Sequence, residues 1–233
     1  MPKTLVIIPT YNEETTIEKL VTTLFELNLG LDIMIVDDGR DQTESIIKRL
    51  QSGHSNLYLI KRLVKSGRGT AVLEGLRFGL RGGYELMVEM DADFSHNPEE
   101  LPELLKLAGP NNLVIGSRYL RGSKIDNWPL SRRIFSRFAN FYANMILKIG
   151  IHDYTNGYRV YGRQAILGLD MDSITSKGYI VLSEIAYRLF KQGATIVERP
   201  THFVNRVRGQ SSFSFKEVKE AFTSVIKLKK RVR

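Results

Sequence analysis

The feature that most constrains the fold is a regular alternation, in the first half of the chain, of short apolar runs with longer segments of helical periodicity. The short runs are rich in β-branched residues and predict strands, whereas the longer segments repeat apolar residues every three or four positions and predict helices. This alternation favours right-handed βαβ units, and so an α/β fold with a mainly parallel sheet flanked by helices. Strands are expected over residues 4–8, 32–36, 57–61, 86–90 and 113–115, and helices over residues 13–27, 42–50, 70–80 and 99–107.

The second half of the chain has a looser pattern. It predicts a helix over residues 131–149 that begins with basic residues, a helix over 181–191, a strand over 195–203 and a basic terminal helix over 215–230. No linker, internal repeat or low-complexity segment separates the two halves. We therefore expect a single domain over residues 1–233, with its two parts meeting near residue 120.

Two absences in the sequence exclude whole classes of function. The chain has no cysteine, which excludes disulfide scaffolds, thiol catalysis, zinc knuckles and iron–sulfur clusters. No stretch approaches the roughly 18 apolar residues of a membrane-spanning helix, and the apolar run near the N-terminus is too short for a signal peptide. The expectation is a cytoplasmic chain, soluble or peripheral at the cytoplasmic face of a membrane.

Charge is distributed unevenly along the chain. Residues 1–112 carry 12 Lys and Arg against 17 Asp and Glu, whereas residues 113–233 carry 22 against 8. A basic second half favours anionic partners: nucleic acid, a phosphorylated substrate or an anionic membrane surface. The alternative is an ordinary charged surface. The same two interpretations apply to the basic tail formed by Lys227, Lys229, Lys230, Arg231 and Arg233.

Polar residues gather where four of the predicted strands end. In open α/β sheets, ligands bind beyond the carboxyl ends of the strands, so this edge is predicted to carry a binding site. The four clusters lie at residues 10–13, 37–38, 91–93 and 116–118.

The pair Asp91 and Asp93 is the centre of the functional hypothesis. Two carboxylates at a strand end, two residues apart, are able to face one cation if the chain turns there, and such oxygen ligands favour Mg²⁺ or Mn²⁺. A divalent cation on a diphosphate would stabilise a nucleoside-diphosphate leaving group. The alternative is an exposed acidic turn.

Nucleotide recognition is the interpretation of the other clusters. Asp38 would accept hydrogen bonds from a base or ribose, Glu13 would hold a ribose hydroxyl, and Tyr11 would stack on a base. Ordinary turn, helix-terminus and loop-packing roles are the alternatives. The glycine-rich segment 65–69 precedes a helix and suits phosphate binding by backbone N–H groups, although it does not have the spacing of a Walker loop.

Arginines in the second half are the candidate phosphate ligands, because the guanidinium fork matches phosphate oxygens. A solvated surface charge is the alternative for each. The helix expected over 131–149 combines a basic start with aromatic and aliphatic residues, which suits a membrane interface, a partner helix or the core. The candidate arginines are Arg118, Arg132, Arg206 and Arg208.

Taken together, these motifs resemble those of the inverting family-two glycosyltransferases with a GT-A fold, and among them the dolichyl- and polyprenyl-phosphate mannose synthases. The resemblance extends from residue 6 to about residue 213, nearly the whole chain. The segments that carry it are IPTYNE (8–13), VDDG (36–39), MDADFSH (90–96), GSRY (116–119), NWPLSR (127–132), NGYR (156–159) and RVRG (206–209).

The resemblance implies a role for each matching position. Residues 1–120 would hold the nucleotide sugar and the metal, and residues 121–233 the acceptor lipid. Asp91, Asp93 and Arg118 would be catalytic. The nucleoside of GDP-mannose would lie against Pro9, Tyr11, Glu13 and Asp38, with Ala92 beside the nucleotide; Asp91 and Asp93 would bind the Mg²⁺ or Mn²⁺ with Ser95 at a third ligand position; and Arg118, Arg132 and Arg206 would face the acceptor and donor phosphates.

Three departures from the family pattern bear on this site. The loop over residues 37–43 is one residue shorter than is usual and bears on the base contacts. Asn156 stands where serine is common. Ser212 stands where lysine is usual, so that a phosphate contact would be lost or transferred to Lys216.

The expected reaction is mannose transfer from GDP-mannose to a polyprenyl phosphate, and several alternatives stay open. A UDP-sugar is the alternative donor. A hydroxyl acceptor would require a general base, for which Asp153 is the candidate. A membrane-anchoring subunit is a possible partner. A nucleic-acid-binding protein is disfavoured, because aromatic residues are not interleaved with Lys and Arg as a stacking surface requires.

Overall fold

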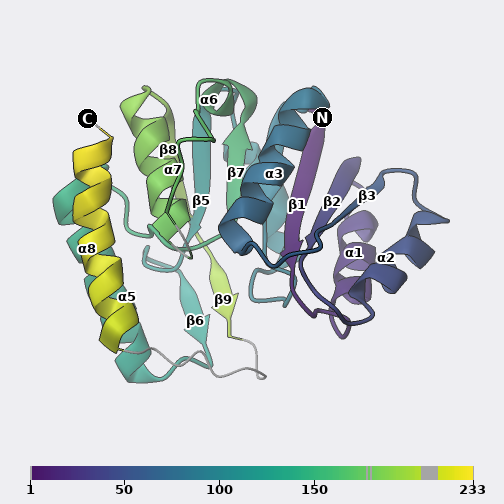
Figure 1. Cartoon of the computed structure of the whole chain (residues 1–233), viewed down its shortest axis with the longest axis horizontal. Coiled ribbons are helices and arrows are strands. Elements are labelled where there is room, and N and C mark those ends of the chain that lie inside the picture. Colours follow the sequence, from purple (N-terminus) through teal and green to yellow (C-terminus); the bar gives the residue numbers. More distant parts are fainter. Residues whose placement is uncertain (1, 177, 179, 206–214, 233) are drawn as a thin grey trace.

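The computed structural model describes residues 2–176, 178, 180–205 and 215–232, with the backbone alone for 215–221. Its centre is a seven-stranded sheet of order β3-β2-β1-β4-β7-β5-β8 (Figure 1), and a second sheet pairs β6 with β9. The strands are β1 (Thr4–Thr10), β2 (Leu31–Asp37), β3 (Leu57–Lys61), β4 (Leu86–Glu89), β5 (Asn112–Ser117), β6 (Lys124–Asp126), β7 (Arg159–Gly162), β8 (Thr195–Pro200) and β9 (His202–Val204).

Helices cover both faces of the large sheet, as the alternation predicts. Side chains of β1 alternate between two cores, since Leu5 and Ile7 pack on one face and Val6 and Ile8 on the other. The first face is covered by α3, α5, α6, α7 and α8, and the second by α1, α2 and α4. The helices are α1 (Ile17–Glu26), α2 (Thr43–Gln51), α3 (Arg68–Arg81), α4 (Leu101–Leu107), α5 (Leu130–Leu147), α6 (Arg163–Leu167), α7 (Ile180–Lys191) and α8 (Phe215–Arg231), with a 3₁₀ turn η1 (Pro98–Glu100) before α4.

Several features of the second half differ from the sequence-based expectation, and two of them concern the large sheet. The predicted strand over residues 195–203 is interrupted at Thr201, so that β8 joins the large sheet and β9 joins the small one. The pattern also missed β7, which is antiparallel to both of its neighbours, β4 and β5. Because β7 has only four residues and begins with an arginine, it lacks the apolar run that identified the other strands. The chain therefore forms one mainly parallel sheet shared by both halves.

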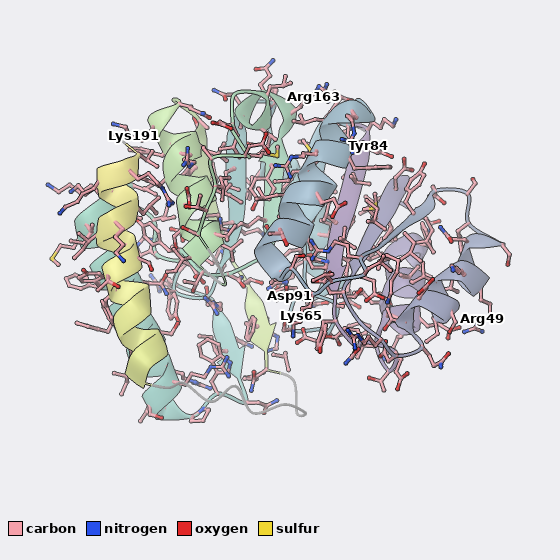
Figure 2. All side chains as sticks on the ribbon, viewed as in Figure 1. Arg49, Lys65, Tyr84, Asp91, Arg163 and Lys191 are labelled. Atoms are coloured by element: carbon pink, nitrogen blue, oxygen red, sulfur yellow. The ribbon has the colours of Figure 1, made fainter. Side chains whose placement is uncertain are left out.

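The register of the parallel strands brings their carboxyl ends to one edge. Thr10 pairs with Asp37, and Ile7 pairs with Glu89, so the residues that follow β1, β2 and β4 emerge side by side. Asp91 and Lys65 lie at this edge in Figure 2, whereas Tyr84 and Arg163 lie at the opposite one. None of the described helices is long and apolar enough to cross a membrane.

Candidate active site

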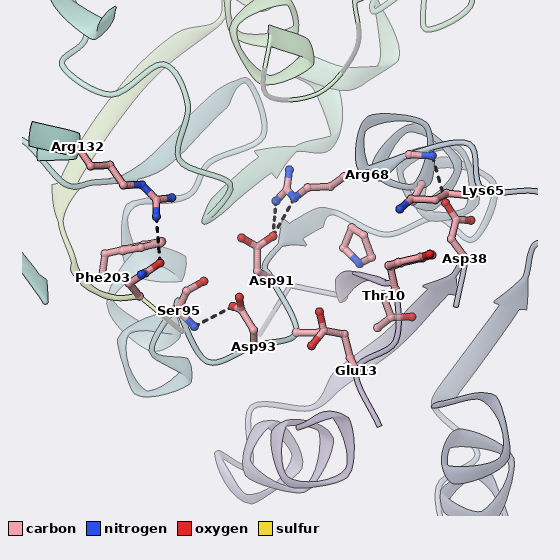
Figure 3. A pocket seen from close by; sticks show the side chains of 16 residues that line it. Thr10, Glu13, Asp38, Lys65, Arg68, Asp91, Asp93, Ser95, Arg132 and Phe203 are labelled. Carbon is pink, nitrogen blue, oxygen red and sulfur yellow. Dashed lines mark hydrogen bonds and ion pairs between the residues drawn. The ribbon is translucent and has the colours of Figure 1, made fainter. Parts of the chain in front are cut away.

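One pocket at the carboxyl edge collects side chains from both halves of the chain (Figure 3). Every residue predicted to hold the nucleotide or the metal lines it. From the second half, Arg132 of α5, Phe203 of β9 and Asn205 contribute. The sequence does not predict the contribution of β9, because its pattern indicates one continuous strand over residues 195–203. The lining residues are Pro9, Thr10, Tyr11, Glu13, Asp38, Lys65, Gly67, Arg68, Ala71, Asp91, Ala92, Asp93, Ser95, Arg132, Phe203 and Asn205.

A tight turn after β4 places the acidic pair in this pocket. Phe94 adopts a positive φ of 58°, and the main-chain N–H of Ser95 donates to Oδ1 of Asp93 at 3.1 Å. His96 stabilises the turn, because its Nδ1 accepts a hydrogen bond from the main-chain N–H of Asp91 at 3.0 Å. The imidazole of His96 is buried and stacks on Tyr158, so it serves the turn.

Arg68 holds one oxygen of Asp91. Its Nε and Nη2 lie 2.8 and 2.7 Å from Oδ1 of Asp91, and its Nη1 lies 2.5 Å from Oε1 of the buried Glu89. Burial by itself raises the pKa of Asp91, but the charge and hydrogen bond of Arg68, together with the nearby His96 and Arg118, outweigh that effect, and the pKa lies below its ordinary value. Asp91 is therefore ionised at neutral pH.

The oxygen donors at this turn fit a hard divalent cation. Asp91, Asp93 and the Ser95 hydroxyl line the same pocket, and the Asp91 side chain is 30% exposed. The described residues contain no group of three or more His, Cys, Asp or Glu side chains able to hold a metal ion. Mg²⁺ is commonly bound by one or two carboxylates together with substrate phosphates, and this donor set matches that arrangement.

Asp38 organises the glycine-rich loop. The fork of Arg62 binds both of its oxygens, with Nε–Oδ1 at 2.5 Å and Nη2–Oδ2 at 2.7 Å. The main-chain N–H groups of Ser66 and Gly67 donate to Oδ2 at 3.2 and 3.1 Å. Sequence reasoning missed Arg62, which lies 24 positions from Asp38 and has no motif around it.

The predicted stacking residue Tyr11 has a cationic neighbour. Tyr11 lines the pocket and is 47% exposed, and Nζ of Lys65 lies 3.5 Å from the centroid of its ring. An amino group over an aromatic face is a favourable cation–π contact. The loop after β3 and the loop after β1 are thereby joined across the pocket.

Arg118 lies outside the pocket lining and is paired with Asp153. Its Nε and Nη2 each lie 2.8 Å from an oxygen of Asp153, and both side chains are buried. Burial raises the pKa of Asp153, but the charge and hydrogen bonds of Arg118 outweigh it, and the pKa is lowered. A buried carboxylate held in this way is a poor general base, which weakens the hydroxyl-acceptor alternative.

Arg132 is the predicted phosphate ligand that reaches the pocket. Its guanidinium lies 4.2 Å from the ring centroid of Trp128, and its Nη1 is 3.4 Å from Oδ1 of Asn205. Arg118 lies 5.2 Å from the same ring, so Trp128 connects the two arginines. The predictions for Arg206, Arg208 and Ser212 fall outside the described residues.

Comparison with known proteins decides the family. A profile of the family "Glycosyl transferase family 2" matches residues 5–168. The chain belongs to this family. It is therefore a glycosyltransferase, and its GT-A fold agrees with solved relatives. A glucosyl-3-phosphoglycerate synthase from Mycobacterium tuberculosis, in complex with Mn²⁺ and UDP-glucose, is 19% identical with a TM-score of 0.67, over 99% of this chain and 79% of that chain.

Two curated relatives are much more similar in sequence to this glycosyltransferase. The polyprenol monophosphomannose synthase of Mycolicibacterium smegmatis is 39% identical over 226 residues, which are 96% of this chain and 85% of the relative. The undecaprenyl-phosphate mannosyltransferase of Micrococcus luteus is 40% identical over 227 residues, which are 96% of this chain and 92% of the relative.

Proposed function

We propose that this glycosyltransferase moves a mannosyl group from GDP-mannose to the phosphate of a dolichyl or other polyprenyl phosphate, with inversion at the anomeric carbon. The two mannosyltransferase relatives support the acceptor and the sugar, because each matches 96% of the chain. The observation that carries the proposal is one pocket in which the carboxylates of Asp91 and Asp93 share the lining with Arg132.

The chemistry requires no general base. A phosphate monoester has a second pKa of about 6, so its oxygen is already an anionic nucleophile at neutral pH. That oxygen forms a bond to the anomeric carbon as the bond from this carbon to the β-phosphate oxygen of GDP breaks, and the electron pair leaves with GDP. The protein supplies position and electrostatic stabilisation, and in this scheme Arg132 holds the attacking phosphate in line.

The donor side of the scheme uses the first half of the chain. Pro9, Tyr11, Glu13 and Asp38 hold the nucleoside, with Ala92 beside the nucleotide. Asp91, Asp93 and Ser95 would hold a Mg²⁺ or Mn²⁺ ion, which would neutralise charge that develops on the departing diphosphate. Because Asp38 already accepts hydrogen bonds from Arg62, it acts on the nucleoside mainly through the loop that it shapes.

The acceptor side uses the second half. Arg132 contacts the lipid phosphate directly, and the buried Arg118 supports Arg132 through Trp128. Arg206 is a further phosphate ligand in this scheme, on the family resemblance alone. Direct contact of Arg118 with a phosphate stays a prediction.

A membrane surface is the proposed location of the reaction. Five large apolar side chains follow one face of α5 and are 54–71% exposed, and the exposed Arg133, Arg137 and Lys148 flank them. An amphipathic helix of this kind binds anionic lipid headgroups with its apolar face buried in the interface. Since Arg132 lies on the same helix, the pocket would face the lipid phosphate. The five residues are Leu130, Ile134, Phe138, Phe141 and Met145.

Transfer of labelled mannose from GDP-mannose to a short polyprenyl phosphate in detergent tests the proposal. We expect labelled lipid with Mn²⁺, none with EDTA, and a loss of at least about a hundredfold for Asp93→Ala. UDP-glucose serves as the competing donor. Product from the UDP-sugar alone would replace the donor assignment, and metal-independent product with unaltered activity of Asp93→Ala would contradict the role of the acidic pair.

A further inference from the structure

The guanidinium of Arg68 lies beside Asp91 at the edge of the proposed cation site (Figure 3), and its other side meets the carboxylate of Glu89. Its Nε and Nη2 contact Oδ1 of Asp91 at 2.8 and 2.7 Å. Oδ2 of Asp91 is 3.8 Å from Nε2 of His96. A positive charge of the chain itself is therefore in direct contact with a proposed ligand of the divalent cation.

Glu89 fixes this guanidinium from the interior. Its side chain is fully buried at the last position of β4, where Oε2 accepts a hydrogen bond from the Tyr161 hydroxyl at 2.6 Å. A buried carboxylate without a cationic partner is strongly unfavourable, so Glu89 keeps Arg68 in place whether or not Asp91 is engaged elsewhere.

Gly157 closes the remaining side. A Cβ atom built at Gly157 would lie 2.0 Å from Nη2 of Arg68, so the backbone at this position packs directly on the guanidinium. Glu89, Asp91 and Gly157 thus confine Arg68 from three directions. The arrangement is built into the fold, because Arg68 is also the first residue of α3.

We propose that Arg68 is a resident counter-cation that weakens binding of a divalent cation to the nucleotide-free pocket, so that the cation is retained together with the donor diphosphate. This inference rests on the proposed function, since it takes Asp91 and Asp93 as the cation ligands. In the absence of nucleotide, the Arg68 guanidinium already neutralises one of these two carboxylates, and its positive charge repels the divalent cation at close range.

The diphosphate reverses this balance. It brings further negative charge and oxygen ligands, which an oxygen-seeking cation requires to complete its coordination. Cation and GDP therefore raise each other's affinity by the same factor. If Arg68 instead served only to orient Asp91, its removal would weaken cation binding, so the two roles predict opposite signs.

Mn²⁺ binding, measured by the electron paramagnetic resonance signal of the free ion, tests the proposal without any turnover. Wild type, Arg68→Met and Arg68→Lys are titrated without nucleotide and with saturating GDP. We expect Arg68→Met to bind Mn²⁺ without nucleotide about tenfold more tightly than wild type, and the gain in affinity on adding GDP to shrink accordingly. Arg68→Lys keeps the charge and should stay within about twofold of wild type.

Removing Arg68 alone leaves Glu89 unpaired, so Arg68→Met/Glu89→Gln is measured in parallel, with thermal unfolding of every variant. The neutral amide of that double variant still offers an oxygen to Tyr161, and the same direction is expected because the removed guanidinium touches Asp91. Unchanged or weaker nucleotide-free Mn²⁺ affinity in the folded variants would overturn the inference. Failure of wild type to bind Mn²⁺ even with GDP would instead overturn the cation in the proposed function.

Discussion

Charged side chains in and near the pocket are paired with other charged side chains of the same chain. Asp153 is the clearest case, because it accepts two side-chain hydrogen bonds from Arg118 and main-chain N–H bonds from Arg118, Thr155 and Asn156. Both partners are buried. Such a pair is costly to break, since the remaining charge has neither water nor a counter-ion.

Replacing Asp153 with asparagine should lower the free energy of unfolding by about 3–5 kcal/mol, because Arg118 would be left buried without its counter-charge. The lowered pKa of Asp153 also predicts the pH dependence. Its contribution is complete above the unfolded-state pKa of about 3.9 and is lost as the pH falls through the lower folded value. Urea unfolding of both proteins between neutral pH and pH of about 3 measures this difference.

An exposed ion pair provides the control for this measurement. Glu103 and Lys106 pair on the surface of α4, and Glu103→Gln should leave stability unchanged at neutral pH. If Asp153→Asn had equally little effect on stability, the Asp153–Arg118 pair would not stabilise the fold. The same conclusion would follow if the difference in free energy of unfolding between this variant and wild type failed to shrink at low pH.

The motifs single out candidate residues that the structure places in one pocket, but they do not identify the partners that hold these residues. Asp38 and Asp91 follow apolar strands within recognisable motifs, and parallel strands bring their ends together. Their partners follow no such rule: Arg62 lies 24 positions from Asp38 and Arg68 lies 23 positions from Asp91. Which arginine meets which carboxylate depends on strand order and register, and a local pattern carries neither.

At the scale of elements, α3 determines where Arg68 and the glycine-rich loop lie. This helix packs very closely on the sheet, because a Cβ at Gly75 would lie 2.3 Å from Cγ2 of Ile7, and one at Gly79 would lie 2.7 Å from Cγ of Met87. The glycines allow the backbone of α3 to approach β1 and β4. The position of the site is therefore sensitive to small side chains on the buried face of the helix.

Gly75→Ala should destabilise the protein by about 1–3 kcal/mol, since the new methyl group overlaps Ile7 in a filled core. It should also raise the KM for the proposed donor GDP-mannose, because displacement of α3 moves Arg68 at its first turn. Thermal unfolding and steady-state kinetics provide the two readouts. Arg81→Ala, at an exposed position of the same helix, is the matched control and should alter neither. If Gly75→Ala had the thermal stability and the KM of wild type, α3 would not be packed as tightly on β1 as the Gly75 contact indicates.

Elements were predictable where an apolar run or a helical period was long enough to be distinctive. The five strands of the first half and most helices appear close to their predicted residues, because burial on both faces requires continuous apolar strands. The strand β6 and the helix α6 have only three and five residues, which is too few to show a repeating pattern of apolar residues. The break at Thr201 arises from tertiary pairing, because β9 pairs with β6 and not with the large sheet.

At the scale of the whole molecule, the two halves differ in charge and meet in one pocket. The acidic half supplies the carboxylates, and the basic half supplies Arg132 and the apolar face of α5. On the proposed function, this face turns toward a membrane while the nucleotide side faces water.

Vesicle co-sedimentation tests this orientation. Wild type should bind vesicles that contain anionic phosphatidylglycerol more strongly than neutral phosphatidylcholine vesicles, and added salt should weaken binding. Phe138→Ser/Phe141→Ser should bind about tenfold or more weakly, because two aromatic rings no longer enter the interface. Leu167→Ser, which changes an apolar side chain exposed on α6, should bind like wild type. If the wild type did not bind vesicles but co-purified with a membrane protein, and Phe138→Ser/Phe141→Ser abolished that co-purification, the apolar face of α5 would instead bind an anchoring subunit.

The position of β7 between β4 and β5 has a consequence for folding during translation. Once residue 120 has left the ribosome, every carboxylate of the pocket has been synthesised, but β4 and β5 have no strand between them. The edge of β4 and the edge of β5 that face each other stay unpaired until residues 159–162 are synthesised. These residues form β7, which pairs antiparallel with both strands. In the interval β4 has one unpaired edge and β5 has two, because its other neighbour β8 is synthesised later still. Unpaired strand edges are the feature by which separate chains aggregate. The half of the pocket that is translated first thus depends on a later segment for its closure.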